Sequence, residues 1–345
     1  MAKFALWWVK WNGPNYESRM TVGGKKATVE DFRERGFDRI VVLDGEGRGS
    51  RYTGPYYDSG RNDGKEFARW VADHISGIPL LYLTIPFYRP DGSQRDQALI
   101  SFGYSGVNSY YKGWIDGVLS VNNGNLKGFY WSYESCLQTG NYGKNVSKEF
   151  IQYMYDYIHD HGLELIWIPA TNDRGVSYLS DDAFDGILKV GGYFDYVFVQ
   201  PNYYQNKNCI ENINGTEQTF PYSYKKLVEK IRYIHDGLQK QVRKQNPNTV
   251  VSIEMEADRT VLGIPCRYSG RCPENMGCDH NLKTCYENCR EHEHGKAINY
   301  ALDYMRALHD TGWEPSDRAY YFSTDLKVID VLQERCRREL NEPYV

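Results

Sequence analysis

Short apolar stretches alternate with amphipathic stretches along the whole chain. The apolar stretches are rich in β-branched and aromatic residues, as buried strands are. They fall at residues 4–9, 39–44, 79–85, 126–134, 163–169, 194–202, 249–256 and 318–323. Most are followed by a stretch with helical periodicity, predicted at residues 65–76, 110–120, 148–161, 222–244, 296–310 and 326–340, with another helix beginning at Thr28.

This alternation predicts an α/β fold in which residues 1–345 form a single (β/α)₈ TIM barrel. Eight strand–helix cycles in order favour a closed parallel barrel over an open sheet. No Gly-x-Gly-x-x-Gly motif follows the first strand, which argues against a dinucleotide-binding fold.

Five of the eight cysteines lie in the loop after the seventh strand, which predicts a Cys-rich insertion at residues 262–292. None of their spacings is the Cys-x-x-Cys pair of a convincing zinc site, so disulfides are favoured over a metal module that would also use His292 and His294. If all eight cysteines pair, at least one of the remaining three must reach the cluster. The cluster contains Cys266, Cys272, Cys278, Cys285 and Cys289, and the others are Cys136, Cys209 and Cys336.

Composition and charge exclude some classes of partner and favour others. The net charge of −4 is spread along the chain, which argues against nucleic acid as a partner. No apolar run approaches the roughly 20 residues of a membrane-spanning helix. The 30 Tyr and 8 Trp favour a carbohydrate partner, because aromatic faces stack on sugars. The cysteines, the acceptor patterns at Asn145 and Asn214, and a chain that opens almost directly with a strand, as a mature domain would, predict a secreted or extracellular protein.

The ends of the fourth and seventh predicted strands carry glutamates. Glu134 ends the fourth strand, and Glu254 and Glu256 lie at the end of the seventh. Active sites of such barrels lie at the C-terminal ends of the strands. Side chains alternate along a strand, so Ser252, Glu254 and Glu256 share one face, which we expect to point into the barrel.

Glycosidic cleavage needs one protonated and one ionised carboxyl group. The aromatic neighbours of Glu134 favour its neutral form and an acid role, whereas polar neighbours favour an ionised Glu256 as nucleophile.

Glutamates at these two strand ends resemble those of the retaining glycoside hydrolases that share this arrangement. Four segments more closely resemble a family of bacterial and archaeal glycosidase-like barrels known only as a domain of unknown function. They are Gly128–Trp131 with Glu134, Trp167–Pro169, Gln200–Tyr203 and Ile253–Glu256. The similarity spans most of the chain, and the Cys-rich insertion departs from it. The resemblance supplies no substrate.

The resemblance implies Glu134 as the general acid/base and Glu256 as the nucleophile, with Glu254 as the substitute. It further implies that Gln200 and Asn202 bind sugar hydroxyls or orient the nucleophile. The mouth would be lined by Asp44, Glu46 and Arg48, and candidate stacking platforms are Trp7, Trp131, Trp167, Tyr203 and Tyr321. By strand alternation, however, Trp131 and Trp167 point away from the lumen if Glu134 points into it.

The sequence therefore predicts a glycoside hydrolase that acts on a polysaccharide or glycan, with a retaining mechanism and no cofactor. A non-catalytic carbohydrate-binding barrel is the first alternative. A metal-dependent hydrolase using Asp44, Glu134 and Glu254 is a second, although it lacks the paired histidines expected at strand ends.

Overall fold

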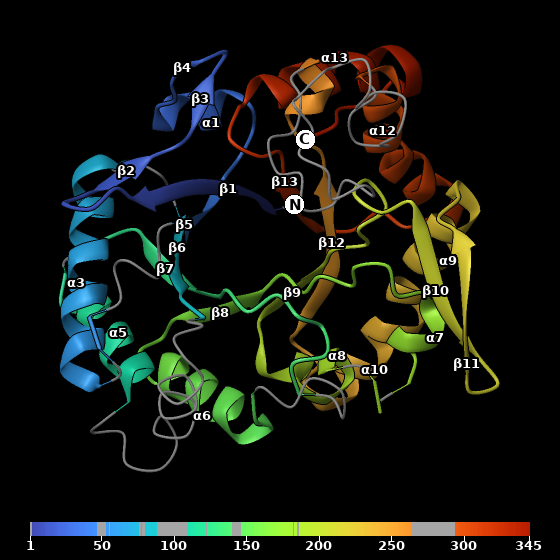
Figure 1. The fold of residues 1–345 in the computed structure, drawn as a ribbon. Helices are drawn as coiled ribbons and strands as arrows, with labels where there is room; N and C mark the ends of the chain where they lie inside the picture. The colour runs from blue at the N-terminus through green and yellow to red at the C-terminus, as the bar shows by residue number, and fades with distance from the viewer. Residues whose placement is uncertain are drawn as a thin grey trace.

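A computed structural model describes residues 2–46, 53–54, 56–75, 77, 80–87, 109–121, 123–139, 146–181, 183–184, 186–263 and 294–345. Within them, eight parallel strands close into a barrel (Figure 1). Each strand pairs with the next in the order of the chain, and the last pairs in parallel with the first, which closes the ring. The strands are β1 (Ala2–Trp11), β5 (Arg39–Glu46), β6 (Leu80–Ile85), β7 (Leu126–Trp131), β8 (Glu164–Trp167), β9 (Tyr196–Val199), β12 (Val250–Glu256) and β13 (Asp317–Tyr321). The prediction of a closed parallel barrel is confirmed.

Helices surround this ring of strands (Figure 1). The longer ones are α3 (Tyr57–His74), α5 (Tyr110–Leu119), α6 (Lys148–His159), α9 (Tyr224–Tyr233), α12 (His294–Thr311) and α13 (Lys327–Leu340). The single helix predicted for 222–244 is present, but one π-helical turn, η2 (Ile234–Leu238), joins α9 to α10 (Gln239–Gln245). Shorter helical segments are α1 (Val29–Glu34), α7 (Val176–Leu179), α8 (Gly186–Val190), η1 (Gly191–Tyr193) and η3 (Arg259–Leu262). No helix in the described part of the chain is long and apolar enough to cross a membrane.

Small antiparallel elements decorate the barrel. β2 (Tyr16–Ser18) pairs with the end of β1, and β3 (Thr21–Val22) pairs with β4 (Lys25–Lys26). β10 (Asn208–Ile213) and β11 (Thr216–Pro221) form a hairpin that the hydrophobic pattern did not predict. Its turn has positive φ at Asn214 (53°) and Gly215 (80°), the backbone that an Asn-Gly hairpin turn requires.

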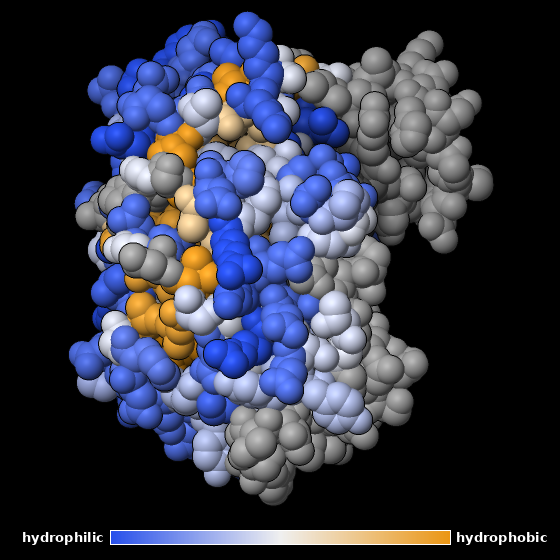
Figure 2. All heavy atoms as spheres, turned by 90° about the vertical axis from the view of Figure 1, so that its left-hand side faces the viewer, coloured by the Kyte–Doolittle hydropathy of each residue, from blue (hydrophilic) through white to orange (hydrophobic). Residues whose placement is uncertain are grey.

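The strands separate two hydrophobic cores. One lies in the lumen and contains alternate strand residues such as Phe4, Tyr82, Tyr130 and Phe198. The larger one lies between the strands and the helices. On the face over α3, hydrophilic residues predominate, with a strip of hydrophobic residues between them (Figure 2).

Helices α3 and α5 pack backbone to backbone through glycines. A Cβ added to Gly60 would lie 2.0 Å from the carbonyl oxygen of Tyr110, and one added to Gly64 would lie 2.3 Å from that of Trp114. Only glycine permits this approach.

The cysteine prediction is corrected in part. Cys209 and Cys336 are buried free thiols, so the case in which all eight cysteines pair does not occur. The predicted Cys-rich insertion, apart from Leu262 and Gly263, lies outside the described residues.

Candidate functional site

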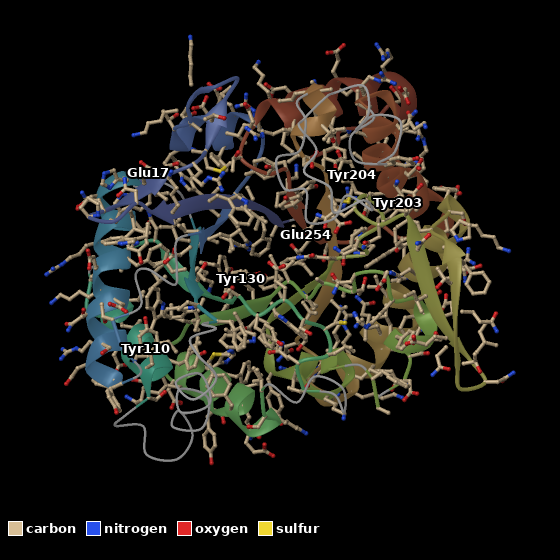
Figure 3. The ribbon with its side chains drawn as sticks, viewed as in Figure 1. Glu17, Tyr110, Tyr130, Tyr203, Tyr204 and Glu254 are labelled. Atoms are coloured by element: carbon tan, nitrogen blue, oxygen red, sulfur yellow. The ribbon has the colours of Figure 1, made fainter. Side chains whose placement is uncertain are left out.

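The inward face of β12 carries the carboxyl groups at the centre of the site. Val251, Ile253 and Met255 pack in the outer core, so the alternate positions Glu254 and Glu256 face the other way. Glu254 pairs in register with Ala319, a lumen residue. In Figure 3, Glu254 and Tyr130 lie toward the middle of the ring of strands.

Glu254 is a buried carboxyl group with one oxygen that has no hydrogen-bond partner among the described residues. Glu254 is only 2% exposed, and its Oε1 makes no hydrogen bond to any described residue. Burial raises the pKa of Glu254 well above its usual range, and the neighbouring charges of Glu256 and Glu134 raise it further. Glu254 is therefore the carboxyl group of the site that favours its protonated form.

Glu256 is fully buried but receives two directed hydrogen bonds. The hydroxyl of Tyr304, on α12, donates to Oε2. The same hydroxyl oxygen accepts the backbone N–H groups of Tyr203 (3.1 Å) and Tyr204 (3.2 Å). The two backbone N–H groups can only donate, so neither uses the single hydroxyl hydrogen of Tyr304. That hydrogen is therefore available to donate to Glu256.

Asn202 supplies the second donor to Glu256. Its Nδ2 donates to Oε1 of Glu256 at 3.1 Å, and its Oδ1 accepts the backbone N–H of Asn172 at 2.7 Å. That N–H can only donate, so the orientation of the amide is determined. Two donors aimed at both oxygens favour the ionised form of Glu256 and act against its burial, which favours the neutral form. Gln200 supports Asn202 by accepting a hydrogen bond from it at 3.3 Å.

Glu134 lies just beyond the end of β7 and is exposed. The hydroxyl of Tyr130 donates to Glu134 Oε1 at 3.0 Å. Burial raises the pKa of Tyr130 strongly, and the charges of Glu134 and Glu254 raise it further. The tyrosine therefore remains a donor, and it lies electrostatically close to both carboxyl groups.

Four of the residues predicted to stack on sugars are buried in the outer core, so the stacking role predicted for them is wrong. Trp7, Trp131, Trp167 and Tyr203 are at most 2% exposed and belong to the outer core. Trp7 stacks on Phe32 with ring centroids 4.6 Å apart. Strand alternation turns the three tryptophans toward the helices, as it predicted for Trp131 and Trp167. Tyr203 lies in the turn after β9 and packs in the same outer core, so these four side chains offer no surface to a ligand in the lumen.

Two other aromatic residues do line the lumen side of the mouth. Tyr321 is half-buried against the lumen core. Trp8, which the sequence analysis did not select, meets it edge to face with ring centroids 6.4 Å apart. The indole Nε1 of Trp8 is buried and has no partner among the described residues. The alternation along β1 was the signal that distinguishes Trp8 from Trp7.

Of the predicted mouth residues of the second strand, only Asp44 has a described side chain, and it faces away from the glutamates. Asp44 is buried, accepts a hydrogen bond from Tyr16 at 3.0 Å, and shares the outward face of Val42. The side chain of Glu46 and all of Arg48 lie outside the described residues. Among the side chains that the structure describes, no group of three His, Cys, Asp or Glu residues is placed to hold a metal ion.

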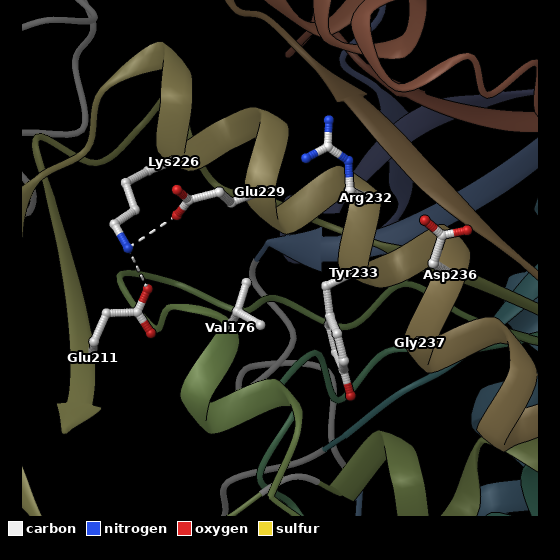
Figure 4. Close-up of a pocket in the computed structure, with 8 residues that line it drawn as sticks. All are labelled: Val176, Glu211, Lys226, Glu229, Arg232, Tyr233, Asp236 and Gly237. Carbon is white, nitrogen blue, oxygen red and sulfur yellow. Dashed lines mark hydrogen bonds and ion pairs between the residues drawn. The ribbon is translucent and has the colours of Figure 1, made fainter. Parts of the chain in front are cut away.

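A separate groove of about 560 Å³ lies on the outer wall, along α9 and η2 (Figure 4). Lys226 is held between two carboxylates there, Glu211 at 2.9 Å and Glu229 at 3.1 Å. The groove therefore offers no comparable set of reactive groups.

Residues 120–220 match the family described as Domain of unknown function (DUF4855). The uncharacterized protein MJ0957 of Methanocaldococcus jannaschii is 30% identical over 360 residues, which cover 95% of this chain and 90% of that protein.

Solved structures with an overall likeness include two glycosidases. A GH18 chitinase from Pseudoalteromonas aurantia is 10% identical, with a TM-score of 0.46 over 98% of this chain and 99% of that one. A β-glucosidase from Trichoderma harzianum is also 10% identical, with a TM-score of 0.47 over 86% and 76%. Likeness at this level does not identify an activity.

Proposed function

Given that the chain belongs to the family of the uncharacterized protein MJ0957, we propose that it is a glycoside hydrolase that cleaves a polysaccharide or glycan. One observation carries the proposal. Glu254 is a buried carboxyl group on the inward face of β12, and burial, followed by the charges of Glu256 and Glu134, raises its pKa so that it favours its proton. Carboxyl groups whose environments separate their pKa values are the acid–base equipment of glycosidic cleavage.

We assign the acid role to Glu254 and the nucleophile role to Glu134. Glu134 attacks the anomeric carbon while the bond to the leaving oxygen breaks, and that oxygen takes the proton of Glu254. The ionised Glu254 then removes a proton from a water molecule, which displaces Glu134 and releases the sugar. This retaining reaction needs roughly 5–5.5 Å between the two carboxyl groups.

This assignment differs from the one expected from sequence neighbours, in which Glu134 is the acid and Glu256 the nucleophile. Both oxygens of Glu256 already accept hydrogen bonds within the protein, and Glu134 is the exposed carboxyl group. In our proposal Glu256 remains ionised, and its charge helps Glu254 to retain its proton.

The aromatic residues at the mouth supply binding in this proposal. Tyr321 and Trp8 offer ring surface to a sugar. The indole N–H of Trp8, which has no partner among the described residues, is suited to donate to a hydroxyl group. The reaction needs no organic cofactor. We further propose a secreted or extracellular setting, supported by the cysteine cluster and the acceptor patterns at Asn145 and Asn214.

The test is product release from a panel of polysaccharides and aryl glycosides. Glu134→Gln and Glu254→Gln should each lower turnover by at least 100-fold, the low end of what a positioned acid or base contributes. Glu254→Gln should lose least on aryl glycosides with acidic leaving groups, because these need no proton. Glu149→Gln, at an exposed position on α6, is the control and should keep full turnover.

Two outcomes would overturn this assignment. Turnover that survives in both variants would remove these carboxyl groups from the reaction. Loss in Glu256→Gln and Glu134→Gln, with full turnover in Glu254→Gln, would favour the assignment expected from sequence. Anomeric configuration, followed by NMR, should be retained.

One observation favours a second candidate, a carbohydrate-binding barrel without catalysis. Glu254, the proposed acid, is only 2% exposed, which limits its access to a substrate in the lumen. Binding of one glycan by the wild-type protein, with no turnover of any substrate, would establish this candidate instead.

A further inference from the structure

A lysine on the outer wall of the barrel is completely buried. Lys230 lies on α9 between the buried residues Leu227 and Ile231 and is 0% exposed. Lysine is almost never fully buried unless paired, because removing its charge from water is costly. No carboxylate forms an ion pair with Lys230 among the described residues, so the reason for its burial must lie elsewhere.

The ammonium group of Lys230 meets neutral acceptors beneath one turn. Its Nζ donates to the carbonyl oxygen of Pro201 at 3.0 Å and to Oγ1 of Thr171 at 3.2 Å. It also lies 4.7 Å from the centre of the Tyr222 ring, a favourable cation–π distance. The hydroxyl of Tyr222 donates to the same carbonyl oxygen at 2.7 Å. All of these contacts converge on the turn that follows β9.

That turn carries the amide that orients Glu256. Asn202 follows Pro201 directly and has a φ of 54°, in the left-handed region that residues other than glycine rarely adopt. Its amide donates to Glu256 from this conformation. Thr171 fixes the other side of the turn by donating to the carbonyl oxygen of Gln200 at 2.8 Å.

We propose that Lys230 is a positioning residue, which holds the Gln200–Asn202 turn so that Asn202 keeps Glu256 ionised and in place. The inference rests on the proposed function for its catalytic consequence, since an ionised Glu256 helps Glu254 to retain its proton. Lys230 touches no reacting atom itself. It acts through the Pro201 carbonyl and through its charge.

Burial lowers the pKa of Lys230 to about 8, against the opposing influence of Cys209, Glu256, Cys136 and Glu211. Above this pH the positive charge behind the turn is lost, although the neutral amine can still donate. We therefore expect a basic limb near pH 8 in the turnover of the wild-type enzyme.

The experiment compares Lys230→Met with Lys226→Met, one helical turn earlier on the same helix. Lys230→Met should lower kcat at least tenfold with KM within twofold, and the limb near pH 8 should disappear. Lys226 pairs with Glu211 and Glu229 at the groove, and Lys226→Met should change kcat less than twofold. Thr171→Val, which removes one partner of Lys230 and leaves its charge, should lower kcat in the same way and serves if Lys230→Met does not fold. Unchanged kcat and an unchanged pH profile in the folded variants would overturn the proposal.

A second readout does not depend on activity. In a double-mutant cycle of urea unfolding, Lys230→Met and Glu256→Gln should be non-additive by at least fivefold in the unfolding equilibrium constant, with Thr171→Val replacing Lys230→Met if needed. Lys226→Met and Glu256→Gln should be additive. Additivity in both cycles would refute the coupling. Coupling in a protein without turnover would refute the proposed function but retain the link between Lys230 and Glu256.

Discussion

Replacing Tyr304 by Phe removes a single oxygen atom that three groups share. The hydroxyl accepts the backbone N–H groups of Tyr203 and Tyr204 and donates to Glu256, all of them buried. A buried donor that loses its acceptor costs about 1–3 kcal/mol, and a hydrogen bond to a charged group contributes about 1.5–3 kcal/mol. Since such terms are not additive, we expect Tyr304→Phe to lower the free energy of unfolding by about 3–5 kcal/mol.

Tyr344→Phe is the matched control. Tyr344 is also a buried tyrosine in the outer core, at 1% exposure, but its hydroxyl makes no hydrogen bond to any described residue. Removing an unpaired buried hydroxyl should leave stability unchanged or raise it. Urea unfolding followed by fluorescence and circular dichroism measures both variants.

Equal small losses in the two variants, below about 1 kcal/mol, would refute the deduced role of Tyr304 as the shared partner. A loss of that size for Tyr304 would also withdraw the reason for holding Glu256 ionised, because one of its two donors would then be dispensable.

Three other outcomes follow from the structure and are measured by unfolding in urea. Gly64→Ala should destabilise by about 1–3 kcal/mol through overpacking against the carbonyl of Trp114, whereas Gly124→Ala, with open space around it, should not. The raised pKa of Glu254 makes the folded protein bind more protons than the unfolded chain above about pH 4.3, so stability should fall with rising pH by up to about 1.4 kcal/mol per unit, and Glu254→Gln should abolish this fall. The lowered pKa of Lys230, about 8 against 10.5, makes the unfolded chain bind more protons between these values, so stability should rise through that window by about 3 kcal/mol, a rise that Lys230→Met should lack.

The barrel and the facing of its strands could be predicted because both depend on local pattern. Alternation along β12 correctly turned Glu254 inward and Ile253 outward, and the same rule turned Trp131 toward the helices. The stacking role given to Trp131 failed because it came from the family resemblance and the aromatic composition, against the strand alternation. Trp8, one residue after Trp7, satisfies the same rule and is the better candidate.

The partners that fix the state of Glu256 could not be predicted from sequence. Tyr304 lies 48 residues away on a helix, where its spacing fits an ordinary buried stripe. Lys230 interrupts the apolar stripe of α9, and a lysine there is expected to extend to solvent. Which acceptor a side chain reaches across the outer core depends on packing between elements that are distant in the chain, and no local period encodes it.

The site concentrates groups that a barrel needs for no structural reason. Among the described residues, one oxygen of Glu254 has no hydrogen-bond partner and Lys230 has no ion pair, although both side chains are buried. Glu256 is buried with both oxygens bonded. Each is less favourable than an apolar side chain of similar size, and a protein tolerates such costs where function requires them. Glu254→Gln should therefore raise stability at neutral pH and, in the same molecule, lower the turnover of polysaccharides by at least 100-fold. If Glu254→Gln neither gained stability nor lost activity, Glu254 would be an ordinary residue of the lumen core, and its burial would have no measurable effect on stability or turnover.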